Sequence, residues 1–136
     1  MKKKLLLAVF ALVLVFATAC GNNETEDATS ETMISVVIDI DFPDDSNVAD
    51  VEEAALDVPE NSTVLDVLNI YADKNNMEVA MDESSKSAYV VSIGGIAATK
   101  TAGWIYEVND EAVMEPADAY KIKENDEISW DFETWE

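Results

Sequence analysis

The side chains able to take part in chemistry are almost all carboxylates. The chain of 136 residues has 29 Asp and Glu against 8 Lys and Arg, a formal net charge of -21, and no His. Without an imidazole there is no Ser-His or Cys-His catalytic pair and no histidine-ligated metal. The single cysteine, Cys20, excludes an intrachain disulfide, a CxxC redox pair and a cysteine-rich zinc site. The strong negative charge also predicts no nucleic-acid partner.

The remaining polar clusters do not have the spacing of catalytic sites. Asp82 and Glu83 are adjacent, as are Asp110 and Glu111, but neighbours in sequence do not face each other as an acid and base pair must. The segment 84–86 reads Ser-Ser-Lys and lacks the S-x-x-K spacing of a serine nucleophile with a lysine partner. We therefore expect no enzyme and no catalytic residue.

Several aspartates gather around the first predicted hairpin. Carboxylate oxygens are the ligands that Ca²⁺ prefers, so this segment is a candidate calcium site. Its spacing, however, does not match an EF-hand loop, which needs D-x-[DN]-x-[DN]-G and a distal Glu. We expect a solvated acidic loop and no metal site, with Ca²⁺ binding as the alternative. The residues are Asp39, Asp41, Asp44, Asp45 and Asp50.

The first 19 residues predict export across a membrane. Three lysines follow Met1, and an uninterrupted apolar run extends from Leu5 to Ala19. At about 1.5 Å per residue a helix over this run spans about 22 Å, which is short of the roughly 30 Å hydrocarbon core of a bilayer. Residues 1–19 are therefore predicted to be a signal peptide and not a membrane-spanning helix.

Cys20 directly follows this run, after Ala-Thr-Ala at 17–19. The placement resembles the lipobox of bacterial lipoproteins, in which cleavage before the cysteine leaves its sulfur to carry a diacylglycerol. The resemblance implies that Cys20 is lipidated and anchors the protein on the extracytoplasmic side of the cell membrane. The alternative is a secreted protein cleaved after Ala19, with Cys20 as a free thiol. Residues 20–32 are polar and acidic, which predicts a disordered linker.

Strand and helix patterns alternate along residues 33–136. Apolar residues at every second position over 34–40 and 54–58 predict two strands joined as a hairpin by an acidic connection. Ser62 or Thr63 can cap a helix whose apolar residues follow at helical spacing up to Ala72. Further strands are predicted at 79–81, 89–93, 104–108 and 127–133.

These elements predict an α+β domain in which one helix packs across a mixed sheet. The most economical topology is ββαββ, a β-grasp. Its first hairpin lies at one side, and the first and last strands pair in the middle. On the last strand Ile128, Trp130 and Phe132 alternate with polar residues, so we expect these three side chains to point one way, with Trp130 in the core.

Four motifs, in order, resemble the DUF4430 family: VPENSTVLDVL at 58–68, YVVSIGGI at 89–96, GWIYEVN at 103–109 and AYKIKENDEISW at 119–130. The resemblance covers about residues 33–133. The family is similar to the C-terminal β-domain of transcobalamin and intrinsic factor, which implies a β-grasp-like fold. Asp110 stands where the family's Asn-Gly turn has Gly, and Asn125 replaces another Gly. Asn and Asp tolerate positive φ, so both turns are expected to survive.

The resemblance also implies a ligand site, because the β-domain of transcobalamin-type proteins closes over cobalamin together with a helical barrel that has no counterpart in this sequence. Glycines in the matching segments would let a ligand approach the backbone. Trp and Tyr would offer a flat amphipathic surface to a corrin edge. The alternative is structural, with a Gly-Gly turn and a core tryptophan. The candidate ligand residues are Gly94, Gly95, Ile96, Gly103, Trp104, Tyr106 and Asn109.

We therefore expect a lipid-anchored extracytoplasmic protein whose domain binds and does not catalyse. Its candidate ligand is cobalamin or a similar tetrapyrrole, captured for a membrane transporter. The alternative is a surface module that binds a protein or a polymer and no small molecule. A concave site centred on Trp104 would favour the first function, whereas a flat exposed apolar patch would favour the second.

Overall fold

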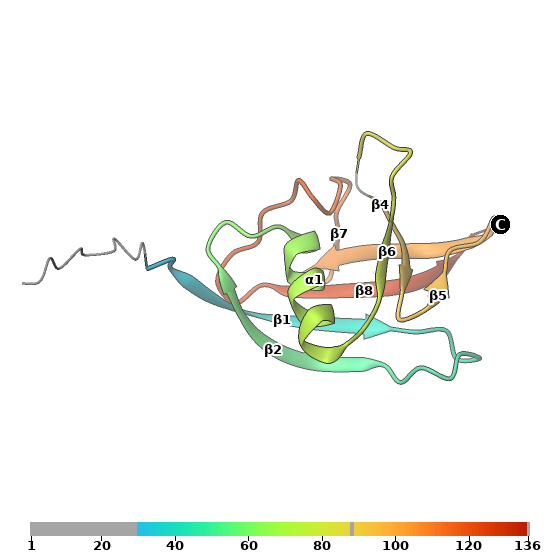
Figure 1. The fold of residues 1–136 in the computed structure, drawn as a ribbon, viewed down its shortest axis with the longest axis horizontal. Helices are drawn as coiled ribbons and strands as arrows, with labels where there is room; N and C mark the ends of the chain where they lie inside the picture. Colours follow the sequence, from blue (N-terminus) through green and yellow to red (C-terminus); the bar gives the residue numbers. More distant parts are fainter. Residues whose placement is uncertain (1–29, 88, 136) are drawn as a thin grey trace, which may run out of the picture. The chain divides into compact units, whose positions relative to one another are not determined.

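The computed structural model describes residues 30–87 and 89–135 (Figure 1). They form an α+β fold dominated by strands. No helix in this described part is long and apolar enough to cross a membrane. The predicted signal peptide, Cys20 and most of the 20–32 linker lie outside the described residues. The elements are β1 (Met33–Asp41), β2 (Val51–Pro59), α1 (Val64–Asn75), β3 (Val79–Asp82), β4 (Tyr89–Ile93), β5 (Ile96–Ala97), β6 (Ala102–Val108), β7 (Glu111–Ala112) and β8 (Glu127–Thr134).

The main sheet contains five strands in the order β2-β1-β8-β6-β7. β1 and β2 form the predicted antiparallel hairpin, and β1 lies parallel to β8. The first and last strands therefore pair in the interior of the sheet, as the sequence predicts. β6 runs antiparallel to β8 along its whole length, whereas the short β7 pairs only with the end of β6. Figure 1 shows β8 and β6 continuing the layer that begins with β2 and β1.

The helix α1 packs on one face of this sheet (Figure 1). Thr63 caps it: the Thr63 hydroxyl accepts the Asp66 backbone N–H at 3.2 Å, and the Asp66 carboxylate accepts the Thr63 N–H at 2.8 Å. This reciprocal pair is a capping box, which satisfies two donors at the helix start. Helical spacing then turns one apolar stripe toward the sheet. Its buried residues are Val64, Val67, Leu68 and Ala72.

The strands β3, β4 and β5 form a separate sheet of three strands, which the economical topology does not contain. The sequence predicts β3 and β4 but not their separation from the main sheet. These strands pair with each other in chain order and do not extend the main sheet. Val90 and Ile93 of β4 are buried in the common core. Gly94 and Gly95, with φ of 58° and 83°, form the tight turn into β5.

The turns that lack the family's glycine keep the left-handed backbone that glycine would supply. Asn109 and Asp110 have φ of 53° and 62° between β6 and β7, and Asn125 has φ of 66° before β8. Asn and Asp adopt this region at a lower cost than other residues with a side chain. The prediction that both turns survive is confirmed.

Candidate ligand-binding groove

An apolar groove of about 390 Å³ opens beside β6, between the start of β4 and the segment 112–117. Small-molecule sites typically have volumes of about 300–1,000 Å³, so this groove is at the lower end of that range. Two segments far apart in sequence form its sides, and the inward face of β6 forms its floor. Residues that line it include Val90, Trp104, Tyr106, Met114, Ala117 and Trp130.

Three aromatic side chains that are almost fully buried form the floor. Trp104 and Tyr106 are each 8% exposed, and Trp130 is 2% exposed. Tyr106 lies opposite Trp130 in the β6–β8 register, and their ring centroids are 5.3 Å apart. Trp104 makes edge contacts with Phe42 and Phe132, at centroid distances of 5.4 and 5.2 Å. Because every ring is packed against another, the floor is rigid.

Two hydrogen bonds from this floor hold neighbouring segments of the chain in place. Trp104 Nε1 donates to the Ile96 carbonyl at 2.9 Å, and the Tyr106 hydroxyl donates to the Glu115 carbonyl at 2.5 Å. The first bond ties β5 to β6, and the second holds the segment 112–117 in place. Burial, followed by the negative charge of Glu115, raises the pKa of Tyr106 to about 12. The Tyr106 hydroxyl therefore remains a proton donor at neutral pH.

Trp130 differs from the other two aromatic residues of the floor. Its Nε1 is buried and has no hydrogen-bond partner among the described residues. A buried donor without an acceptor costs about 1–3 kcal/mol. This nitrogen has almost no exposed surface, so it is not open to the groove, although other atoms of Trp130 line it.

Two exposed apolar side chains border the opening of the groove. Met114 is 96% exposed and Tyr89 is 57% exposed. Large apolar side chains gathered at the surface mark interaction sites more often than singly scattered ones do. Methionine also adapts its shape to different partners. The groove therefore combines a rigid aromatic floor with an adaptable rim.

The structure divides the predicted ligand residues into two groups. Trp104 and Tyr106 line the groove. Gly94, Gly95 and Ile96 lie in and after the β4–β5 turn and do not line it. The positive φ of both glycines serves that turn. The Ile96 carbonyl accepts the Trp104 hydrogen bond, and its side chain packs against the core.

Gly103 and Asn109 also lie away from the groove. The ring of Trp135 occupies the space beside Gly103, where an added Cβ would lie 2.6 Å from Trp135 Cη2. The missing side chain of Gly103 therefore makes room for this tryptophan. Asn109 donates to Asp126 Oδ1 at 2.9 Å, and its Oδ1 accepts the Glu127 N–H at 3.0 Å. Asn109 thus ties the β6–β7 turn to the start of β8.

The sequence did not predict the side of the groove formed by 112–117. One sequence feature could have indicated a buried or binding role for this segment: the apolar pair Val113 and Met114 interrupts an otherwise acidic stretch. Nothing in the spacing indicates that this segment folds back onto β6. The hydrogen bond from Tyr106 to Glu115 fixes that position, and it joins residues whose contact no periodicity predicts.

The opposite face of the main sheet is acidic. Asp41 and Asp131 lie directly opposite each other in the β1–β8 register. Partial burial, then the hydrogen bond with Asp41 and the charges of Asp41, Glu107 and Glu133, raise the pKa of Asp131 to about 6. Across residues 30–87 and 89–135, no three Asp, Glu or Cys side chains are grouped closely enough to hold a metal ion. The aspartates of the first hairpin form no such group.

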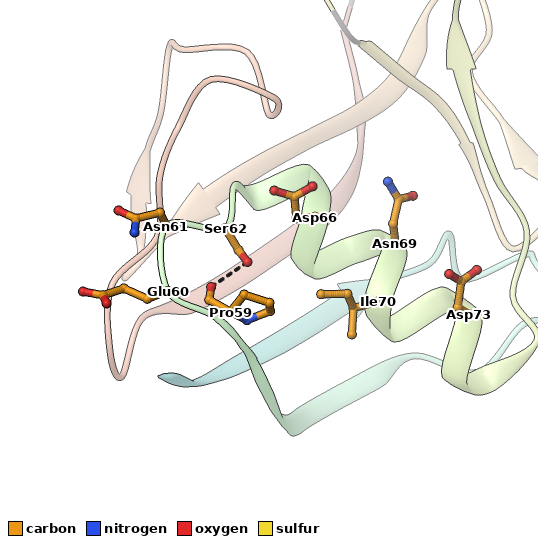
Figure 2. A pocket seen from close by; sticks show the side chains of 8 residues that line it. All are labelled: Pro59, Glu60, Asn61, Ser62, Asp66, Asn69, Ile70 and Asp73. Atoms are coloured by element: carbon orange, nitrogen blue, oxygen red, sulfur yellow. Dashed lines mark hydrogen bonds between the residues drawn. The ribbon is translucent and has the colours of Figure 1, made fainter. Parts of the chain in front are cut away.

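A second hollow, of about 380 Å³, lies at the start of α1 (Figure 2). The Ser62 hydroxyl donates to the Pro59 carbonyl at 2.6 Å, and Figure 2 marks this bond between two residues that line the hollow. The Asp66 carboxylate that lines this hollow already accepts the Thr63 N–H in the helix cap, and no aromatic residue lines it. The groove beside β6 is therefore the candidate site. Side chains lining the second hollow include Glu60, Asn61, Asp66, Asn69 and Asp73.

A sheet with one helix across it and an aromatic groove at its edge defines a small α+β domain suited to binding. The family described as "Domain of unknown function (DUF4430)" matches residues 61–134, which is more than half of the chain. The protein belongs to the DUF4430 family.

Two solved structures are similar to this fold. Haptocorrin in complex with Cbi has a TM-score of 0.67 and 18% identity, with 78% of this chain and 26% of that chain covered. A proposed metal-binding protein from Ruminococcus gnavus ATCC 29149 has a TM-score of 0.50 and 15% identity, with 78% and 100% covered. The chain thus spans about a quarter of the haptocorrin chain. A comparison with curated proteins finds no match.

Proposed function

We propose that this protein is a non-catalytic binding protein whose groove beside β6 captures a small amphipathic ligand. The observation that carries the proposal is the concave apolar groove with three packed aromatic rings in its floor. Flat apolar ligands stack on such rings.

The ligand that we propose is cobalamin or a similar tetrapyrrole. The shared fold with haptocorrin, solved in complex with Cbi, supports this choice, as does the resemblance to transcobalamin-type β-domains. A groove of about 390 Å³ accommodates only one edge of a macrocycle of this size. The rest of the ligand would extend past Met114 and Tyr89, where a second protein can cover it.

That second protein is, in this proposal, a membrane transporter that receives the ligand. Lipidation at Cys20, after removal of residues 1–19, would hold the protein on the extracytoplasmic side of the cell membrane. The linker 20–32 would let the domain, residues 33–136, reach the transporter. The basic and apolar leader directly before the single cysteine supports this arrangement.

Equilibrium dialysis of the full chain in mild detergent, against cobalamin and separately against haem, tests the ligand. We expect saturable binding of cobalamin, and we expect Met114→Asp to weaken it about tenfold by placing a charge at the apolar rim. Met33→Asp is the matched control, because Met33 is 52% exposed and does not line the groove. Equal losses in both variants, or no uptake of either compound at millimolar concentration, would contradict the proposal.

A further inference from the structure

The main sheet has a second face, on the side away from α1, where large apolar side chains stay exposed. Side chains alternate along a strand, so the residues between the core positions of β1, β6 and β8 all point to this outer face. Ile105 is 42% exposed there, and Trp135, just after β8, is 47% exposed. Two such side chains on one sheet face, in a chain this rich in charge, make it a candidate interaction surface.

Asp131 lies at the centre of the outer face. In the strand registers it stands directly opposite Asp41 of β1 on one side and Ile105 of β6 on the other. Glu133 comes two residues later on β8, and Glu107 comes two residues after Ile105 on β6, so both point the same way. Three hydrogen-bonded strands therefore hold four carboxylates around one exposed isoleucine.

Trp135 is fixed at one end of this face. Its backbone N–H donates to the Thr101 carbonyl at 2.8 Å, and its indole Nε1 donates to the Lys100 carbonyl at 3.3 Å. The ring lies beside Gly103, which is opposite Glu133 in the β6–β8 register. An aromatic ring next to a carboxylate suits arginine, whose guanidinium can stack on the ring and pair with the carboxylate at the same time.

The charges that act on Asp131 are all negative. They come from Asp41, Glu107 and Glu133, one on each of the three strands, and together with partial burial they raise the pKa of Asp131. A positive charge brought to this face is therefore attracted by several carboxylates at once. Across residues 30–87 and 89–135, no three acidic side chains are close enough together to hold a metal ion. The cations that fit are consequently separate groups on a larger molecule.

We propose that the outer face is a docking surface for a partner protein that presents arginine or lysine side chains around an apolar centre. The cationic groups would pair with the carboxylates, and the apolar centre would contact Ile105 and Trp135. A second copy of this chain does not fit, because it carries the same net charge of -21. These carboxylates lie on the face opposite the groove floor, so the proposal does not rest on the small-ligand function.

Calorimetric titration of the full chain in an uncharged detergent, at about 0.1 M NaCl, tests the proposal. The probe is the capped peptide Arg-Arg-Leu-Arg-Arg, and the same peptide with citrulline in place of arginine is its uncharged control. We expect saturable binding of the arginine peptide and none of the control. Spermine carries a similar positive charge without an apolar centre, and it should bind more weakly. No binding of the arginine peptide, or equally tight binding of spermine, overturns the proposal.

Charge variants locate the contact on the outer face. The double variant Glu107→Gln and Glu133→Gln should weaken binding of the arginine peptide about tenfold, because both carboxylates are on this face. The double variant Asp73→Asn and Glu78→Gln removes the same charge at exposed positions on and after α1, and it should change binding less than twofold. Equal losses would show a general attraction to an acidic chain and refute the proposal. Because no cobalamin is present, these results are independent of the small-ligand proposal.

The pH dependence of binding tests the central position of Asp131. This carboxyl ionises as the pH rises through about 6, among the negative charges of Asp41, Glu107 and Glu133. Its ionised form attracts the peptide, so the affinity should rise about fivefold from pH 5 to pH 7. In Asp131→Asn the rise should fall below twofold, because the amide does not titrate. An equal rise in the variant, or an affinity independent of pH in the parent chain, contradicts a cation bound over Asp131.

Discussion

At the residue scale, Asp131 shows how the acidic face of the main sheet affects stability. Partial burial and the neighbouring carboxyl of Asp41 raise the pKa of Asp131 to about 6. An acid whose pKa is higher in the folded chain than in the unfolded chain stabilises the fold only while it is protonated. This contribution is fully present below pH about 4, the ordinary range of an aspartate, and is lost as the pH rises through about 6.

Replacing Asp131 by Asn should therefore stabilise the protein above pH 6. We expect a gain of about 1 kcal/mol at pH 8, after allowance for screening by solvent, and no gain at pH 4. Urea unfolding at a series of pH values measures the difference between variant and parent chain. Asp44→Asn, on the exposed loop after β1, removes one charge elsewhere and serves as the control. A gain that is independent of pH would contradict this assignment.

At the element scale, the start of α1 depends on a local signal that acts over three residues. Thr63→Ala removes the hydroxyl that accepts the Asp66 N–H. We expect the free energy of unfolding to fall by about 1 kcal/mol, the usual cost of losing such a cap. Thr32→Ala, at an exposed position outside any helix, should change little. Chemical denaturation followed by circular dichroism measures both variants, and equal losses would show that the cap is not responsible.

Local signals such as this cap explain which elements the sequence predicts, and contacts between distant segments explain which it does not. The hairpin, the helix and the last strand follow from alternation, helical spacing and capping, all of which act within a few residues. The separate sheet and the side of the groove at 112–117 depend on contacts between distant segments, such as the bond from Tyr106 to Glu115. For Trp104 the sequence left core and ligand roles as alternatives. The structure places its buried ring both in the core and in the groove floor.

At the scale of the whole molecule, the main sheet separates two chemically different surfaces. One face packs against α1 and ends in the apolar groove, and the other presents carboxylates from β1, β6 and β8. The carboxylates keep the exposed face soluble and limit the sites where an apolar partner can dock. They also repel one another, because the chain has 29 acidic residues against 8 basic ones. Solubility and selectivity are thus obtained at a cost in stability.

This repulsion predicts that the fold gains stability when salt is added. Raising NaCl from about 0.01 M to about 0.1 M shortens the screening length from about 30 Å to about 10 Å. We expect the free energy of unfolding in urea to rise by about 1 kcal/mol, because the folded chain holds its carboxylates closer together than the unfolded chain does. The gain should shrink at pH 4, where many carboxylates are protonated. A loss of stability with salt would instead show that attractive pairs involving the few lysines outweigh the repulsion among the acids.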